Sequence, residues 1–569
     1  MYILGISGMG HDPAAALLDD GAVIAAIEEG KLSRQREAEG IPHNAIQFCL
    51  DRAGIRWSDL DRIAAASRPV PSWSRRALLR AKIAPFHPVS SGYYLSRAFG
   101  HLGAGLNYFR VLSVLAGEPK DRVRGFDHHL AHAASAYFGS PFERALIVTL
   151  DQDGDGRAGF VGIGEGAGIR ELASVPLPHS LAWAYRQVTR LLGFRPRGDE
   201  HKTQWLSLGG EPAFAGLFLE MLRRFPGGAP RLNTKYFGRD FAGELSFTDA
   251  FYSRLGISRG AEARMDDAVR ACIAASLQQA CATILSEWLE TLRAKTGARA
   301  LCLAGGLFLN PLLVAAVEKQ TAFDDVFVQP AAGNEGTALG AAWLAWDQAT
   351  RRRAAPMSSM YWGPAYSNEA IKQVLDNCKA LYRWCDSEDR VIDEAIGLLA
   401  SGKIVAWFQG AAEFGPRALG NRSLLASPWA PYVKENLNDY IKHREAFRPF
   451  ALSIPEEDAA EYFECSRNAR FMATMARAKE KGRKLLDALP QGFLLRDGLV
   501  RLHTVTAESN PLFWKLLKRS ATRGPAPILV NTSFNLFGEP LVVTPRDAMR
   551  SYYCSGTDAL VAGSFLLTK

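Results

Sequence analysis

Residues 128–156 read HHLAHAASAYFGSPFERALIVTLDQDGDG and contain the most informative pattern in the chain. The run ALIVTL at 145–150 predicts a buried strand. The Asp- and Gly-rich turn after it, together with FVGI at 160–163, predicts a second strand that returns beside the first. The start of the chain repeats this plan, because 2–8 leads through a turn into two further predicted strands at 14–19 and 22–28. Two such units, each followed by helices, predict a duplicated α/β domain.

This duplication is typical of the actin/Hsp70-like ATPase fold, in which a nucleotide binds between the halves. Glycine-rich loops support the prediction, because each follows a predicted strand. LCLAGGLFLN at 301–310 places Gly305 and Gly306 after one strand, and PAAGNEGTALGAA at 330–342 follows another. Such loops let a backbone approach a nucleotide closely.

The two histidines at 128 and 132 lie four residues apart, so a helix places both rings on one face. Asp151 stands at the end of the predicted strand. Two imidazoles and one carboxylate suit a divalent metal. The alternative is that the histidine pair only caps or packs a helix. A calcium loop is excluded, because its twelfth position, counted from Asp151, is Gly162 instead of a bidentate Glu.

Composition limits the class of protein. The 569 residues predict roughly two to four domains, and the formal net charge of +8 is modest, so it favours anionic small molecules over nucleic acid. Eight cysteines without a CxxC pair argue for a reducing cytoplasm. The first residues predict a strand in place of a signal peptide, and we expect no membrane-spanning helix.

Several segments organise the rest of the chain. The residues 266–295 predict a long amphipathic helix, and 348–359 predicts a linker, which separates a first domain at 1–350 from a second at 360–569. Arg75, Arg76, Arg80 and Lys82 form either an anion-binding face or, as we prefer, a solvated one.

The second domain carries basic and hydroxyl side chains near the ends of predicted strands. Four segments show this pattern: 413–423, 442–450, 500–505 and 528–535. Arginine forks and a lysine charge suit a phosphate pocket. The alternative is a set of surface salt bridges, in which Glu413 and Glu445 neutralise some of the arginines.

The chain resembles the NodU/CmcH-type carbamoyltransferases over essentially its whole length. The matching motifs include HHLAHAASAYF at 128–138, EFGPRALGNRS at 413–423, KHREAFRPFA at 442–451 and NTSFNLFGEP at 531–540, besides the two glycine-rich loops. The resemblance implies a TsaD-like, actin-type ATPase domain followed by a YrdC-like α/β domain. It also implies an enzyme that uses ATP to move the carbamoyl group of carbamoyl phosphate, through carbamoyl-adenylate, to a hydroxyl of a small-molecule acceptor, a natural product or a sugar. Neither nucleic acid nor a membrane is expected as a partner.

The resemblance also implies the roles of individual residues. His128, His132, Asp151 and Asn334 resemble the ligands of Fe²⁺ or another divalent metal, and His11 resembles a base near the transferred group. Gly305, Gly306, Asn310 and Asn531 resemble nucleotide contacts. Five residues resemble those of the pocket for carbamoyl phosphate and the adenylate: Arg417, Lys442, Arg444, Arg501 and Ser533.

Two departures from the family pattern stand out. Asn334 occupies a position where many relatives have Asp, which removes one negative charge from the metal site. The stretch Arg34–Glu37 lacks the Lys-His pair of many relatives, which affects acceptor recognition. The residue Asn334 leaves open a catalytically weakened relative. A component of threonylcarbamoyl-type tRNA modification is a further alternative, because the resemblance implies TsaD-like and YrdC-like parts, which both serve that modification.

Overall fold

The computed structural model describes residues 1–8, 11–67, 112, 114, 122–223, 225–239, 245–260, 262–489 and 492–569. The predicted basic face with Arg75, Arg76, Arg80 and Lys82 lies outside these residues. The chain divides into two compact units. Unit 1 contains Met1–Ile24 and Glu39–Pro356, and unit 2 contains Ala25–Ala38 and Met357–Lys569. Residues early in the sequence therefore belong to unit 2.

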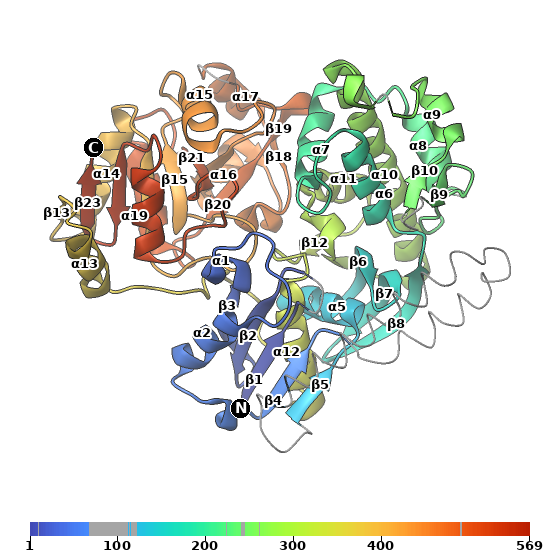
Figure 1. Cartoon of the computed structure of the whole chain (residues 1–569), viewed down its shortest axis with the longest axis horizontal. Helices are drawn as coiled ribbons and strands as arrows, with labels where there is room; N and C mark the ends of the chain where they lie inside the picture. Colours follow the sequence, from blue (N-terminus) through green and yellow to red (C-terminus); the bar gives the residue numbers. More distant parts are fainter. Residues whose placement is uncertain are drawn as a thin grey trace. The chain divides into compact units, whose positions relative to one another are not determined.

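Two five-stranded sheets in Figure 1 share one strand order. When the strands of each sheet are counted along the chain, the first is antiparallel to the second and parallel to the fourth. This repeat confirms the duplicated α/β domain and is the topology of the actin/Hsp70-like ATPase fold. The first sheet has the order β3 (Ala22–Glu28), β2 (Ala14–Asp19), β1 (Tyr2–Ile6), β4 (Arg62–Ala65) and β5 (Val123–Gly125); the second has the corresponding order β8 (Gly168–Pro176), β7 (Arg157–Glu165), β6 (Arg144–Gly154), β11 (Ala300–Ala304) and β12 (Asp325–Val328).

Two central helices join these sheets (Figure 1). Helix α12 (Gly336–Thr350) packs on β1, β2 and β4, α5 (His128–Gly139) packs on β6 and β11, and the two helices pack against each other. Their close approach depends on Gly340, since a Cβ there would lie 1.8 Å from the backbone oxygen of Ala131. Any larger residue would push the helices apart.

The predicted tight turn between β6 and β7 is confirmed at Asp155 and Gly156, both of which have positive φ. The predicted helix at 266–295 is present as α10 (Asp267–Thr296), but the expectation that it is amphipathic is wrong. Its buried residues include the consecutive run Ile273–Leu277, so most sides of the helix face the protein. By length and composition alone, α10 is the one helix of the described residues that could cross a membrane. However, 67% of its most apolar 18-residue window is buried, as in the core helix of a globular protein.

The remaining elements of unit 1 lie around α10 and along the second sheet. They are α2 (His43–Ala53), α6 (Leu181–Leu191), α7 (Glu200–Leu206), α8 (Ala215–Leu222), α9 (Asp249–Leu255), α11 (Pro311–Gln320) and the hairpin β9 (Phe237–Arg239) with β10 (Leu245–Phe247).

Unit 2 is built on an eight-stranded mixed sheet with a separate core on each face. Along β14 (Val405–Phe408), Val405 and Trp407 belong to a core with α14 (Glu388–Ala400) and α18 (Pro511–Ser520). In contrast, Ala406 and Phe408 belong to a core with α13 (Asn368–Asn377) and α19 (Pro545–Tyr553). This alternation follows from the two-residue period of a strand. The sheet order is β13 (Arg383–Trp384), β23 (Phe565–Thr568), β22 (Ala559–Ala562), β14 (Val405–Phe408), β15 (Arg422–Ala426), β21 (Leu529–Ser533), β16 (Ala451–Pro455) and β20 (Leu502–Val505).

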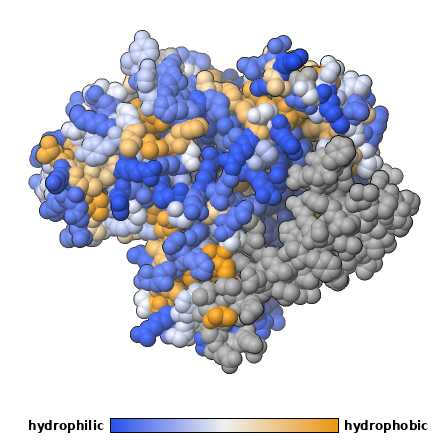
Figure 2. Space-filling model, in the orientation of Figure 1, coloured by the Kyte–Doolittle hydropathy of each residue, from blue (hydrophilic) through white to orange (hydrophobic). Residues whose placement is uncertain are grey.

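A smaller sheet and several helices complete unit 2. The sheet consists of β17 (Phe463–Glu464), β18 (Ala476–Ala478) and β19 (Leu499–Val500). The helices are α1 (Glu29–Ser33), α13 (Asn368–Asn377), α14 (Glu388–Ala400), α15 (Val433–Glu435), α16 (Glu456–Tyr462), α17 (Glu480–Asp487), α18 (Pro511–Ser520) and α19 (Pro545–Tyr553). All eight cysteines of the chain are free thiols. Hydrophilic side chains cover most of the coloured surface in Figure 2.

Candidate functional site

A cluster of two histidines and one aspartate in unit 1 forms the predicted metal site. Asp127 caps α5, since its carboxylate accepts a hydrogen bond from the backbone N–H of Leu130 at 2.9 Å. His128 and His132 follow on one face of that helix, and their Nε2 atoms lie 3.1 Å apart. Asp151 on β6 places Oδ2 3.2 Å from Nε2 of His132 and 3.8 Å from Nε2 of His128. The fold therefore brings the three side chains together.

The charges within this cluster suit a cation. Burial alone raises the pKa of the Asp151 carboxyl, but hydrogen bonds from both imidazoles hold that pKa well below its usual range. Burial lowers the pKa of His132, which keeps this imidazole neutral and able to ligate. The three ligand atoms lie within 4.8 Å of one another. Imidazole nitrogen and carboxylate oxygen at such spacing fit a divalent first-row metal.

His11 and Asn334 form a separate contact in unit 1. The ring Nδ1 of His11 lies 2.7 Å from Oδ2 of Asp12, and this hydrogen bond raises the pKa of His11. The Asp151 charge contributes in the same direction. Within the described ranges, the hydrogen bonds of the Asn334 side chain go to His11, with its amide nitrogen 3.2 Å from Nε2 of that ring. The structure thus joins the predicted base to the predicted fourth ligand.

The predicted nucleotide contacts of unit 1 also pack closely against β6 or cap a helix. Gly305 has φ +98°, and a Cβ there would lie 2.2 Å from the backbone oxygen of Leu150, so only glycine fits against the end of β6. A Cβ on Gly306 would lie 3.2 Å from Oδ1 of Asp151. Asn310 caps α11, since its Oδ1 accepts from the backbone of Leu312 and its Nδ2 donates to Gln278 at 2.9 Å. These contacts favour a structural role for Asn310.

A cluster of cations in unit 2 contains the predicted phosphate-binding residues. Lys442 ends a π-helical segment, Asn436–Lys442, and its buried Nζ donates to Oδ1 of Asn535 at 2.7 Å and to the backbone oxygen of Ser533. The Ser533 hydroxyl also donates to Asn535 Oδ1, at 2.7 Å. Arg444 donates from Nε to Asn438 Oδ1 at 2.9 Å and packs over the Phe450 ring.

The arginines of this cluster repel one another. Burial, followed by the charges of Arg417, Arg444 and Arg448, holds the pKa of Arg501 well below its usual range. Burial and the charge of Arg448 lower the pKa of Arg444 to about 9. Burial also lowers the pKa of Lys442 strongly. The repulsion among these buried cations therefore favours the binding of an anion.

The two glutamates considered as partners for these arginines have different positions. Glu445 lies 3.8 Å from Arg448. Glu413 is fully buried, and its Oε1 accepts three backbone hydrogen bonds, from Leu419, Asn421 and Arg422. Glu413 thus organises the loop that carries Arg417.

Sequence reasoning missed Lys31, which also supports this loop. Its buried Nζ donates to the backbone oxygens of Glu413 and Gly415, both at 2.8 Å, and pairs with Glu28 at 2.9 Å. Arg34, in the stretch that departs from the family, donates to the backbone oxygen of Leu541 at 2.6 Å. In the sequence, Lys31 and Arg34 are only basic residues in or next to α1. Nothing in that pattern indicates their partners, which lie far away along the chain.

The predicted contact Asn531 lies deeper in unit 2, on β21. Its amide donates to the Ser453 hydroxyl at 3.0 Å, and that hydroxyl lies 2.9 Å from Nδ1 of His503. Burial lowers the pKa of His503 to about 3, so this histidine is neutral near pH 7. The three side chains form a buried polar network beside the cation cluster.

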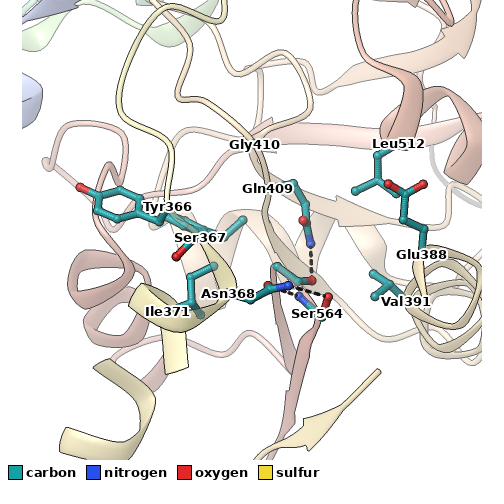
Figure 3. Close-up of a pocket in the computed structure, with 12 residues that line it drawn as sticks. Tyr366, Ser367, Asn368, Ile371, Glu388, Val391, Gln409, Gly410, Leu512 and Ser564 are labelled. Atoms are coloured by element: carbon teal, nitrogen blue, oxygen red, sulfur yellow. Dashed lines mark hydrogen bonds between the residues drawn. The ribbon is translucent and has the colours of Figure 1, made fainter. Parts of the chain in front are cut away.

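A cavity of about 290 Å³ in unit 2 does not include these cations (Figure 3). The amide of Asn368 is already bonded to Ser564, and that of Gln409 donates to the backbone of Gly563. The residues that line it include neither lysine nor arginine. This cavity therefore does not suit a phosphate.

Comparisons with known proteins agree with the order of these motifs. Residues 2–343 match the family model described as "Carbamoyltransferase N-terminus", and residues 396–569 match "Carbamoyltransferase C-terminus". An uncharacterized protein of Synechocystis sp. is 33% identical over 100% of this chain and 97% of its own length. Nodulation protein NolNO of Sinorhizobium fredii is 34% identical over 98% of this chain and 79% of its own length. Among solved structures, component A of the (R)-2-hydroxyglutaryl-CoA dehydratase of Acidaminococcus fermentans is 14% identical, with a TM-score of 0.34 over 61% of this chain and 99% of that one.

Proposed function

The chain belongs to the carbamoyltransferase family, and it is an enzyme of the transferase class. From this membership we propose that it carbamoylates a hydroxyl group of a small-molecule acceptor, with carbamoyl phosphate and ATP as the other substrates. We assign the formation of carbamoyl-adenylate to unit 2, taken as YrdC-like, and the transfer of the carbamoyl group to unit 1.

The cation cluster of unit 2 is the observation that carries this proposal. Lys442 is 6% exposed, and its hydrogen bonds go to neutral oxygens of Ser533 and Asn535. A buried ammonium without a nearby carboxylate is costly unless an anion binds. Carbamoyl phosphate and the triphosphate of ATP both supply such an anion.

The first reaction would use this cluster to bind phosphoryl oxygens. Water would cleave carbamoyl phosphate into carbamate and inorganic phosphate. An oxygen of the carbamate would then attack the α-phosphorus of ATP, and pyrophosphate would leave. Lys442, Arg444 and Arg501 would stabilise the negative charge that develops on the transferred and leaving groups. Arg417 would join them from the loop that Glu413 organises.

The second reaction would take place beside the histidines of unit 1. The acceptor oxygen would bond to the carbamoyl carbon, the bond from that carbon to the adenylate oxygen would break, and AMP would leave. His11, oriented through Nδ1 by Asp12, would take the proton of the acceptor hydroxyl at Nε2. His128, His132 and Asp151 would hold Fe²⁺ or another divalent metal, with Asn334 as an additional ligand, and such a metal acts as a Lewis acid on a carbonyl oxygen.

The test is pyrophosphate release from ATP by the full-length protein with ferrous iron and without acceptor. We expect release to require carbamoyl phosphate and to fall at least a hundredfold in Lys442→Ala. Lys372→Ala is the matched control, since Lys372 is exposed and pairs with Asp376 on α13. Release that is independent of carbamoyl phosphate, in a folded protein that binds ATP, would contradict the adenylate route.

A further inference from the structure

Three helices and two loops of unit 2 surround the cavity of about 290 Å³ in Figure 3. Ile371 on α13, Val391 on α14 and Leu512 on α18 give it aliphatic walls, and the turn from β22 to β23 closes one side. Lysine and arginine are absent from the described residues that line it, and the carboxylate among them, Glu388, lies 3.0 Å from Nζ of Lys515. The cavity therefore suits an uncharged ligand with an apolar body.

The carboxamide of Gln409, directly after β14, lies within this cavity. Figure 3 shows it between Ser367 on one side and Leu512 on the other. The residue is only 7% exposed, and its Nε2 donates to the backbone oxygen of Gly563 at 2.9 Å. Within the described ranges, its Oε1 has no hydrogen-bond partner. A buried amide oxygen without a partner costs free energy that a bound ligand can recover.

The contacts of Gln409 fix the direction of this amide. Because the carbonyl of Gly563 only accepts hydrogen bonds, the nitrogen of the carboxamide must face it. The main chain of Gln409 is held as well, since its N–H donates to the backbone oxygen of Asn421 at 3.0 Å and its carbonyl accepts from Arg422. The side chain therefore presents an acceptor, Oε1, next to the second N–H of Nε2. The complementary ligand edge has a donor next to an acceptor.

Nucleobases have such an edge on a flat ring. A glutamine side chain binds adenine in this bidentate manner, because it accepts from the amino group and donates to a ring nitrogen. The Ser564 hydroxyl accepts from Nδ2 of Asn368 at 3.2 Å, and its own O–H can donate to a further acceptor on the ligand. The cavity volume is close to about 300 Å³, the lower limit for ligand pockets, so a base or a nucleoside fits better than a nucleotide.

Gln409 is also the first residue of the loop 409–421, which carries Arg417. The hydrogen bond between the main chains of Gln409 and Asn421 closes the base of this loop. The Asn421 amide also donates to the backbone oxygen of Ala411 at 2.8 Å. A ligand that holds Gln409 would thus stabilise the ordered form of the loop.

We propose that this cavity is a regulatory site for a free nucleobase or nucleoside, separate from the cation cluster, and that the bound ligand orders the loop 409–421. The expected effect on the rate rests on the proposed function, in which Arg417 takes part in the formation of carbamoyl-adenylate. Arg417 contributes only while the loop holds it in position. A bound nucleoside should therefore raise the rate of pyrophosphate release.

The experiment is a calorimetric titration of the full-length protein, without ATP or carbamoyl phosphate, with adenosine, cytidine, guanosine and uridine in turn. We expect at least one nucleoside to bind. Gln409→Leu removes the bidentate contact and Leu512→Trp fills the cavity, so each should raise Kd at least tenfold. Gln373→Leu, the same change at an exposed position of α13 outside the cavity, should leave Kd unchanged. Lys442→Met should also leave it unchanged, because Lys442 belongs to the cation cluster and does not line this cavity.

A rate measurement tests the link to the loop. The nucleoside that binds should raise kcat of carbamoyl-phosphate-dependent pyrophosphate release at least twofold in wild type and in Gln373→Leu, but not in Gln409→Leu. Four results would each overturn the inference: no binding of any nucleoside, wild-type Kd values in both cavity variants, inhibition competitive with ATP, or binding without a change in kcat. Any of them together with normal release would leave the proposed function intact. Nucleoside binding that depends on Gln409, in a protein that releases no pyrophosphate, would support the cavity and contradict the proposed function.

Discussion

The ammonium nitrogen of Lys442 lies 2.7 Å from Oδ1 of Asn535, 93 residues later in the chain. Its other hydrogen bonds go to the backbone oxygens of Ser533 and Asn535 and to the Ser533 hydroxyl. These acceptors orient the lysine, but they are neutral oxygens and do not balance its charge. Such an arrangement favours binding of an anion at the expense of stability in the free protein.

Lys442→Met should therefore stabilise the ligand-free protein while abolishing ATP binding. We expect a gain of about 1–3 kcal/mol, because the buried charge is replaced by an apolar chain of similar length. Thermal unfolding with and without ATP measures both effects. The exposed control Lys372→Met should change neither, and a variant that loses stability but still binds ATP would contradict the prediction.

Anion binding to the cluster should take up protons. The pKa of Lys442 is strongly lowered, and that of Arg444 is about 9, so both are partly deprotonated in the free protein under alkaline conditions. A bound anion raises these pKa values again, so affinity for inorganic phosphate should fall as the pH rises above about 8, where phosphate is dianionic. Calorimetry in buffers of different ionisation enthalpy measures the uptake, which should shrink in Lys442→Met.

His503 should make the protein sensitive to acid. Its pKa is about 3 in the folded protein against an ordinary value of 6.5, so the unfolded chain binds more protons between these values. Stability should then fall by about 1.4 kcal/mol per pH unit as the pH drops below about 6.5. Denaturant unfolding at pH 7.5 and 5.5 should show a smaller difference in His503→Gln than in wild type. The control His43→Gln, at an exposed position, should keep the full difference.

Removal of one histidine of the cluster should remove the metal, whereas removal of its neighbour should not. His132→Ala should lose at least nine-tenths of the bound metal after loading with ferrous iron, because it deletes one of the two imidazole ligands. His129→Gln should retain it, since the ring of His129 bonds to Thr149 at 2.8 Å and to the backbone of Arg157. Elemental analysis gives the stoichiometry. Equal loss in both variants would mean that the cluster is not the metal site.

Glu413 should control pyrophosphate release through the loop that it organises. Glu413→Ala removes the acceptor of three backbone hydrogen bonds and should lower kcat at least a hundredfold. Glu413→Gln keeps one oxygen in place and should restore much of this loss. Rates combined with thermal unfolding separate loop order from general destabilisation. Identical effects of both variants would argue against the positioning role.

The sequence alone determined the repeated plan of strand, Asp/Gly turn and strand, and the helical spacing that aligns His128 with His132. These features have short periods, so they depend mainly on local backbone geometry. The order of the motifs also identified the family correctly, since several independent segments agree. Predictions about the environment of single helices were weaker. Helix α10 was expected to be amphipathic, but its neighbours bury most of its sides.

Only the tertiary structure decided which polar atoms meet. In the structure Asn310 caps α11, and Gly305 packs against the end of β6. The Glu413 carboxylate accepts from backbone N–H groups, and residues 25–38 belong to unit 2. The physical reason is that a polar side chain bonds to whatever donor or acceptor the fold brings near. Those partners lie far away in the sequence, where no local pattern reports them.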